Sequence, residues 1–131
     1  MAIEGVQTRW SFPAGANLTQ YTFVKLTSTG TVIPCAATTD RPIGVVQDAP
    51  LSGDTATVCV IGITKLVTGA AATTGLPVAT DIGTDASAAG LAIVPGTDTT
   101  KYLVATVIEA SAAAAEYCSV WVNCPTAGRA A

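Results

Sequence analysis

The most reactive side chains in this sequence are four cysteines and three lysines, and the chain has no histidine. Without histidine, the sequence excludes Ser-His-Asp and Cys-His nucleophilic sites, histidine-ligated zinc and the usual general base near neutral pH. Lys25, Lys65 and Lys101 each lie in or next to a strand-like run, and no motif pairs any of them with a serine as a Ser–Lys dyad would require. We therefore expect a protein that is not an enzyme and that has no cofactor.

The cysteines, at positions 35, 59, 118 and 124, allow two interpretations. An even number in a small protein is compatible with two disulfides. However, Cys59 and Cys118 occur inside strand-like runs as small apolar residues, and a cytosolic chain keeps its thiols reduced. Cys118 and Cys124 also lack the C-x-x-C spacing of a zinc site. We favour reduced cysteines that act as small apolar residues and bind no metal.

Two aspartates, Asp81 and Asp85, flank a glycine-containing segment and raise the possibility of a calcium loop. The spacing lacks the alternating D-x-D-x-D-G ligands and the terminal glutamate of such a loop. Aspartate and glycine are the residues that tight turns select. We therefore predict a turn here and no metal site.

Length and composition predict one domain that is covered in part by other chains. The 131 residues are enough for one hydrophobic core, and only 11% of them are charged while 50% are hydrophobic. A typical soluble domain has about 25% charged residues. Such an uncharged surface indicates that further copies or a partner cover part of it, so we expect a homo-oligomer.

Net charge and hydropathy argue against two classes of partner. The formal net charge is −3, so no basic field attracts nucleic acid. Apolar runs such as Ala112 to Ala115 are far shorter than the ~20 residues that span a bilayer, so we expect no membrane segment. The beginning of the chain, MAIEGVQTRW, has Glu4 and no apolar run, which is unlike a secretory signal or a transit peptide. We expect synthesis in a cytoplasm.

Almost every patterned segment predicts a β-strand, because it is short, rich in Val, Ile and Thr, and bounded by turn residues. The expected strands are Tyr21 to Leu26, Thr31 to Cys35, Pro42 to Gln47, Thr55 to Ile61, Thr64 to Val67, Leu91 to Val94, Tyr102 to Glu109 and Glu116 to Asn123. The fold class is therefore all-β, as a compact small β-barrel or β-sandwich.

Alternation predicts which side chains face inward in two of these strands. In the last strand, Cys118, Val120 and Val122 alternate with Tyr117, Ser119, Trp121 and Asn123. Between positions 55 and 60, Ala56, Val58 and Val60 alternate in the same way with Thr55, Thr57 and Cys59. We expect the first set of each strand to be buried and the second set to face outward.

Two further segments carry less regular patterns. Tyr102 to Ile108 is almost continuously apolar, which is typical of a strand covered on both faces. Ala110 to Ala115 has high helix propensity but is too short for an isolated helix, so we expect a short helical turn between two strands.

Residues 1–16 show neither helical nor strand periodicity, and we interpret them as an extended N-terminal arm in front of a single β-domain at residues 17–131. The arm carries Arg9, Trp10 and Phe12 in a chain that is otherwise poor in aromatic residues. One hypothesis is that these three residues contact a partner, because aromatic residues and arginine are typical interface anchors. The alternative is that Trp10 and Phe12 fold back onto the domain's own core.

A resemblance to a known family appears in residues Thr39 to Pro50 and Gly53 to Lys65. The first block contains a D-x-P-x-G-V step at Asp40 to Val45, and the second a V-x-V-x-G step at Val58 to Gly62. Gly90-Leu91-Ala92, Ala110 to Ala115 and Val120-Trp121-Val122 add to it. In these steps and their order, most of residues 17–123 resembles the capsid decoration, or cement, proteins of tailed bacteriophages.

The resemblance implies a compact β-domain on the outside of a phage head, often a trimer, that contacts the major capsid protein. Virion localisation and stabilisation of the assembled shell follow from it. Such a role suits a chain without catalytic groups, because many modest contacts repeated over a lattice supply avidity.

A different class of function stays open from the residues alone, namely a β-rich binding module such as a fibre, an adhesin or a carbohydrate-recognising domain. In that case Trp10, Trp121, Tyr21 and Tyr117 would supply a stacking platform for a sugar.

Overall fold

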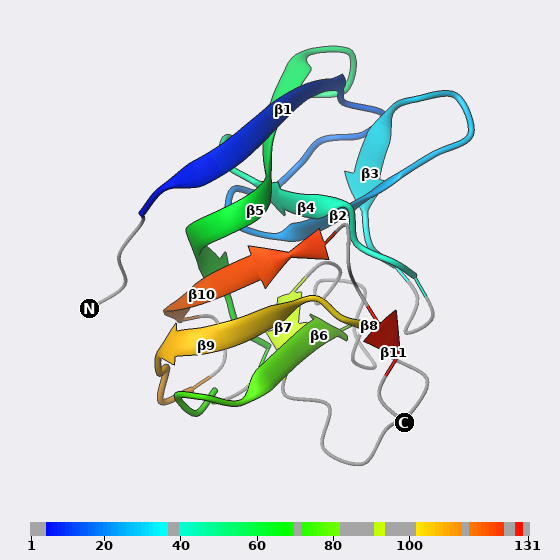
Figure 1. Ribbon diagram of the computed structural model, residues 1–131. Coiled ribbons are helices and arrows are strands. Elements are labelled where there is room, and N and C mark those ends of the chain that lie inside the picture. The colour runs from blue at the N-terminus through cyan, green and yellow to red at the C-terminus, as the bar shows by residue number, and fades with distance from the viewer. Residues whose placement is uncertain are drawn as a thin grey trace.

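The protein is an all-β domain built around one curled antiparallel sheet, as the computed structural model shows (Figure 1). The structure describes residues 5–36, 40–69, 72–81, 91–93, 102–113, 116–124 and 128–129. Its strands are β1 (Gln7–Pro13), β2 (Phe23–Leu26), β3 (Val32–Pro34), β4 (Gly44–Val46), β5 (Thr55–Val67), β6 (Pro77–Asp81), β7 (Leu91–Ile93), β8 (Tyr102–Leu103), β9 (Ala105–Glu109), β10 (Tyr117–Asn123) and β11 (Gly128–Arg129). The predicted all-β class and small barrel-like fold are confirmed.

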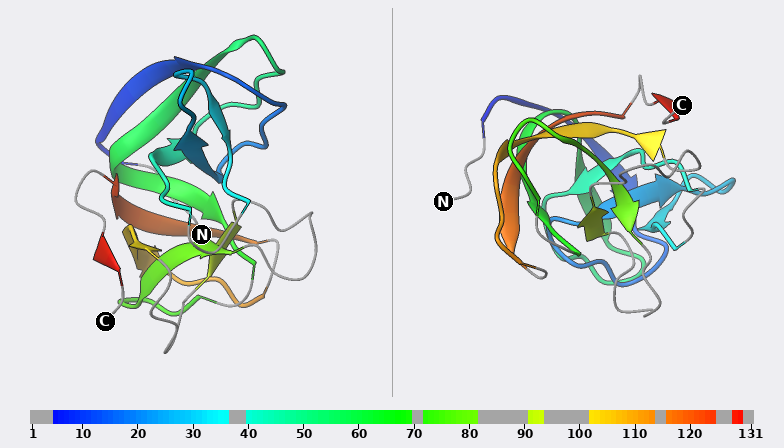
Figure 2. Two further views of the ribbon diagram at one scale, coloured as in Figure 1. Left: turned by 90° about the vertical axis from the view of Figure 1, so that its right-hand side faces the viewer. Right: turned by 90° about the horizontal axis from the view of Figure 1, so that it is seen from below.

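The sheet has the strand order β3-β2-β4-β5-β10-β9-β6-β7, and β1 adds to β5. Its curl outlines part of a barrel when the molecule is seen from below (Figure 2, right). A separate two-stranded ladder joins β8 to β11. Within the described residues, no helix is long and apolar enough to cross a membrane.

Strand β5 organises the whole molecule because both halves of the sheet meet along its 13 residues. Its first part pairs with β1 and β4, and its second part pairs with β10. We predicted two strands here, at Thr55 to Ile61 and Thr64 to Val67, with a break between them. The break is wrong, because Gly62 bends the strand without ending it and its φ of 135° suits glycine.

An irregularity near the middle of β5 changes which side chains lie on each face of the sheet. Against β1, the register skips Val60, since Thr8 lies opposite Ile61 and Arg9 lies opposite Cys59. One extra residue in a strand moves every later side chain to the other face. Ala56 and Val58 consequently belong to one buried cluster, whereas Leu66 belongs to the other.

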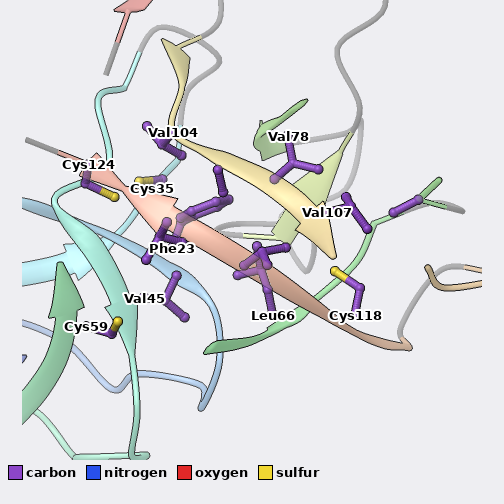
Figure 3. Close-up of a cluster of buried hydrophobic side chains, with 14 residues drawn as sticks. Phe23, Cys35, Val45, Cys59, Leu66, Val78, Val104, Val107, Cys118 and Cys124 are labelled. Carbon is purple, nitrogen blue, oxygen red and sulfur yellow. The ribbon is translucent and has the colours of Figure 1, made fainter. Parts of the chain in front are cut away.

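Two buried clusters make up the core. The larger cluster includes Phe23, Val45, Leu66, Val120 and Val122, and Figure 3 shows several of its side chains together. The smaller cluster lies on the opposite face of β2, β4 and the first half of β5, and its members are Ala14, Leu18, Val24, Val32, Val46, Ala56 and Val58. The sheet is thus covered on both faces in this region, which explains why Cys59 is buried although alternation predicted that it faces outward.

Strand β10 confirms most of the predicted alternation. Cys118, Val120 and Val122 are fully buried, while Trp121 is exposed. Ser119 is the exception, since it is fully buried on the face that we expected to be outward. The ladder between β10 and β9 shifts register between Ser119 and Val120, so the simple two-residue period does not hold there.

Two further predictions need correction. The predicted strand Tyr102 to Glu109 is interrupted at Val104 and forms β8 and β9. Residues 110–113 form no helical turn, because Ser111 makes a β-bridge with Ala72 and a bend follows it. Residues 82–85 of the predicted Asp turn, as well as residues 114 and 115, lie outside the described residues; Asp81 itself ends β6, opposite Leu91.

The segment that we interpreted as an arm without periodicity is strand β1 of the main sheet. Its seven residues pair with β5 from Gln7 to Pro13. The sequence pattern does not reveal this strand, because most of its side chains are exposed and it lacks an apolar stripe. A signal was nevertheless present: Trp10 and Phe12 are two residues apart and flanked by Arg9, Ser11 and Pro13, which is the spacing of one strand face.

Candidate functional site

An apolar groove of about 700 Å³ lies beside β1 and contains two of the three predicted contact residues. We call it the Trp10 groove, and its lining residues are Trp10, Phe12, Leu26, Arg41, Pro42, Ile43, Val60 and Cys124. These come from β1, β2, the segment before β4, β5 and the residue after β10. Only the folded sheet brings them together.

Two exposed apolar side chains define the accessible part of this groove. Trp10 is 64% exposed and Leu26 is 47% exposed. Phe12, Ile43 and Val60 instead pack against the smaller buried cluster and hold the base of the groove in place. Phe12 therefore folds back onto the domain's own core, whereas Trp10 stays open to solvent, and contact of these residues with a partner stays a prediction.

The third predicted residue, Arg9, does not line the groove. Successive side chains alternate across a strand, so Arg9 points to the face opposite Trp10. Its guanidinium Nε donates a hydrogen bond of 2.6 Å to Oε1 of Gln7. The cation that lines the groove is instead Arg41, from the D-x-P-x-G-V step.

The segment that carries Arg41 is tied down by its neighbour Asp40. The Asp40 carboxylate pairs with Nζ of Lys25 at 2.9 Å and accepts a hydrogen bond of 2.8 Å from the Ala36 N–H. Four residues after Asp40, Gly44 lies so close to β5 that an added Cβ would meet the Cys59 carbonyl oxygen at 2.5 Å. The D-x-P-x-G-V step thus fixes one wall of the groove.

Cys124 lies at the end of β10, where the groove meets the larger core cluster. It is 2% exposed, and its sulfur points toward that of Cys35 (Figure 3). Burial, followed by the nearby Cys59 and Cys35 thiols, raises the pKa of Cys124 to about 12. All four cysteines are buried and none forms a disulfide, and the described residues contain no group of three or more Cys, Asp or Glu side chains placed to hold a metal ion.

The main chain of β1 adds a second feature to the groove. Within the described part of the chain, residues 7–13 pair with β5 alone. At the far end of β1, the Ala14 N–H donates to the Asp54 oxygen and the Ala14 oxygen accepts from the Gly53 N–H, both at 2.8 Å. Ala14 therefore directs both main-chain groups toward β5.

The main-chain N–H and C=O groups of Ser11 and Arg9 in β1 point away from β5. Thr57, opposite Ser11, donates its N–H to Asp48 Oδ1 at 3.3 Å and accepts from the Gln47 N–H at 2.8 Å, away from β1. Antiparallel ladders alternate hydrogen-bonded and non-hydrogen-bonded pairs. The N–H and C=O groups of Ser11 and Arg9 consequently face the open edge of β1.

A second groove, of about 300 Å³, lies beside the other tryptophan and differs in character. We call it the Trp121 groove, and its lining residues are Pro77, Leu103, Val104, Ala105, Thr106, Trp121 and Asn123. Trp121 is 61% exposed. None of these lining residues lines the Trp10 groove.

The four aromatic residues that we considered as one stacking platform are divided among three places. Trp10 and Trp121 line separate grooves. Tyr21 and Tyr117 pack edge to face against each other with their ring centroids 5.6 Å apart, and Nζ of Lys65 lies 5.8 Å from the Tyr21 ring centroid. A single four-residue platform is wrong.

Comparison with known proteins identifies one informative structural neighbour. No family model matches the sequence, and no curated protein matches it. The fold is similar to that of the head fibre gp8.5 N base of bacteriophage phi29, with a TM-score of 0.66 over 89% of this chain and 94% of that one. The two sequences are 16% identical, so the likeness shows a shared fold.

Proposed function

We propose that this protein is a structural component of a phage head, and specifically a decoration protein that binds the outside of the shell and stabilises it. The likeness to a head fibre base over nearly the whole length of both chains is the observation that carries the proposal. The sequence resemblance to decoration proteins supports the same assignment. The proposed role is structural and needs no catalytic group.

The Trp10 groove and the open edge of β1 are the surface that we assign to contact with the major capsid protein. An extended segment of the partner can pair with the outward N–H and C=O groups of Arg9 and Ser11 and place alternate apolar side chains in the groove. Main-chain pairing supplies affinity and the groove supplies selectivity in this type of interaction. Arg41 favours an acidic residue in the bound segment.

Binding to the assembled shell but not to its dissociated subunits would stabilise the shell by mass action. Assembly into a homo-oligomer, with a trimer favoured, would multiply each modest contact through avidity. The low proportion of charged residues in the chain suits such close packing.

The direct test is sedimentation of native-source particles on a density gradient, followed by detection of this chain in the fractions. We expect it to sediment with particles at a fixed ratio to a major shell protein. Recovery of the chain as a small free oligomer, with none in the particle fractions, would contradict the proposed function.

Point variants test the assigned surface, because deletion of residues 2–13 would remove a strand of the sheet and uncover Phe12 and its core contacts. Trp10→Ala should weaken binding to particles that lack this chain by at least about tenfold, as expected for an interface anchor. Trp121→Ala removes an equally exposed tryptophan and is the matched control, for which we expect unchanged binding.

A second pair of variants separates main-chain pairing from side-chain contact at the same position. Ser11→Pro removes the outward N–H, and proline is tolerated on an edge strand. Ser11→Ala removes only the hydroxyl. We expect weaker particle binding for Ser11→Pro alone, after thermal unfolding has established that both variants are folded. Equal binding by the two variants would argue against strand addition at β1.

A further inference from the structure

Trp121 lies at the centre of a row of side chains that crosses four strands on the outer face of the sheet. It is opposite Ile63 of β5 on one side and Thr106 of β9 on the other, and Thr106 is in turn opposite Pro77 of β6. Residues directly opposite each other in an antiparallel sheet share a face. The indole is thus flanked by an apolar residue on one side and by a hydroxyl on the other.

Asn123 adds an amide to the same face of β10. It follows Trp121 by two residues, a separation of about 7 Å along a strand, and both residues are exposed. Asn123 and Thr106 line the Trp121 groove together with Leu103, Val104 and Ala105. The groove therefore combines one aromatic surface with an amide and a hydroxyl, two side-chain groups that can each donate and accept hydrogen bonds.

We propose that the Trp121 groove binds a neutral pyranose sugar, such as a terminal hexose of a cell-surface glycan. A pyranose has one face of C–H groups, which suits an exposed indole, and a rim of hydroxyls that need donors and acceptors around it. The groove, of about 300 Å³, has room for one such ring.

The charge of the groove restricts the ligand class to uncharged sugars. None of the described residues that line it is charged, so it provides no ion pair for a sialic or uronic acid. The Trp10 groove is different, because it contains Arg41 and is lined otherwise by apolar side chains and Cys124. The two exposed tryptophans therefore predict two kinds of partner, and the sugar site is independent of the proposed attachment to a shell.

The test uses the indole N–H signals of the two tryptophans, which two-dimensional ¹H–¹⁵N NMR resolves and which Trp10→Phe and Trp121→Phe assign. The probes are the methyl β-glucopyranoside, β-galactopyranoside and α-mannopyranoside. For one of them we expect a saturable shift of the Trp121 signal with a dissociation constant on the order of 1 mM, typical of one shallow site. The Trp10 signal should stay in place.

Two variants make the assignment to this groove specific. Trp121→Ala should weaken binding of that sugar by at least about tenfold, as measured by saturation-transfer NMR on the sugar protons. Trp10→Ala, the matched control, should bind it as the wild type does. Absence of a saturable Trp121 shift up to about 100 mM sugar, or equal shifts of both indoles, would overturn the proposal.

Discussion

The two exposed tryptophans of this protein are almost equally accessible, at 64% for Trp10 and 61% for Trp121, yet their surroundings have little in common. Trp10 lies on an edge strand beside an apolar groove that contains one arginine. Trp121 lies on an inner strand of the sheet, in a row with a hydroxyl and near an amide. The comparison teaches that exposure of an aromatic residue indicates a contact surface, whereas its neighbours indicate what the surface binds.

Strand β5 joins the two regions at Gly62, and substitution of this glycine has the largest expected effect on stability. An added Cβ at Gly62 would collide with the Val6 carbonyl oxygen and the Gln7 Cα, and the φ of 135° is unfavourable for alanine. We expect Gly62→Ala to lower the free energy of unfolding by about 3 kcal/mol, measured by urea denaturation. Because the collision is with the segment that leads into β1, the Trp10 indole signal should shift more than that of Trp121.

Gly30→Ala is the control for Gly62→Ala. Its φ of 84° is also left-handed, but nothing lies within 4 Å of an added Cβ. We expect a loss of about 1 kcal/mol from backbone strain alone. Equal losses for the two variants would mean that the close approach at Gly62 does not hold β1 against β5.

Unfolding at alkaline pH tests the packing of the core near each exposed tryptophan. Cys124 lies at the Trp10 groove, and Cys118 lies in the same strand as Trp121. Burial raises the pKa of Cys118 from 9.0 to about 11, and Cys124 titrates at about 12. Between pH 9 and these pKa values, the two thiols are deprotonated in the unfolded chain but still protonated in the folded protein. Stability should therefore be fully present below pH 9 and fall as the pH rises, by about 2 kcal/mol per thiol at pH 10.5.

Chemical denaturation at pH 7 and at pH 10.5 checks this prediction. Cys118→Ala and Cys124→Ala should each lose about half of the pH-dependent difference, although both variants are less stable at pH 7 because they leave a small cavity. A pH-dependent difference that persists in full in the double variant would show that other groups cause it.

The smallest expected effect concerns the Lys25–Asp40 ion pair beside the Trp10 groove. The side chains are 29% and 15% exposed, so solvent screens their attraction. We expect Lys25→Met to cost about 0.5 kcal/mol in thermal unfolding at low salt, and less in about 1 M salt. The Trp10 signal should move slightly through Arg41, and a shift confined to Trp121 would contradict the separation of the two regions.

Sequence patterns predicted most of the sheet because eight runs carried the composition and spacing of strands. Strand β6 escaped prediction because it begins with Pro77 and contains Ala79 and Asp81, which are weak strand formers. The burial of Cys59 and Ser119 depends on a sheet covered on both faces and on register shifts, which no local alternation reveals.

The candidate site was predictable only at its most conspicuous residues. Trp10 and Phe12 stood out as aromatic residues in a chain with few of them, and both line the groove. Leu26, Arg41 and Cys124 come from distant positions in the sequence and meet them through the strand order. The wrong assignment of Arg9 arose because the segment was not recognised as a strand, whose alternation sends Arg9 and Trp10 to opposite faces.

The pairing of β1 with β5 over seven residues also has a mechanical consequence. A pull along the axis of β1 stretches the hydrogen bonds of this ladder simultaneously, whereas a pull across the strand breaks them one after another. A partner strand added parallel or antiparallel to β1 would transmit tension along that axis. The same ladder that completes the sheet would then carry the tension between this domain and a bound partner strand.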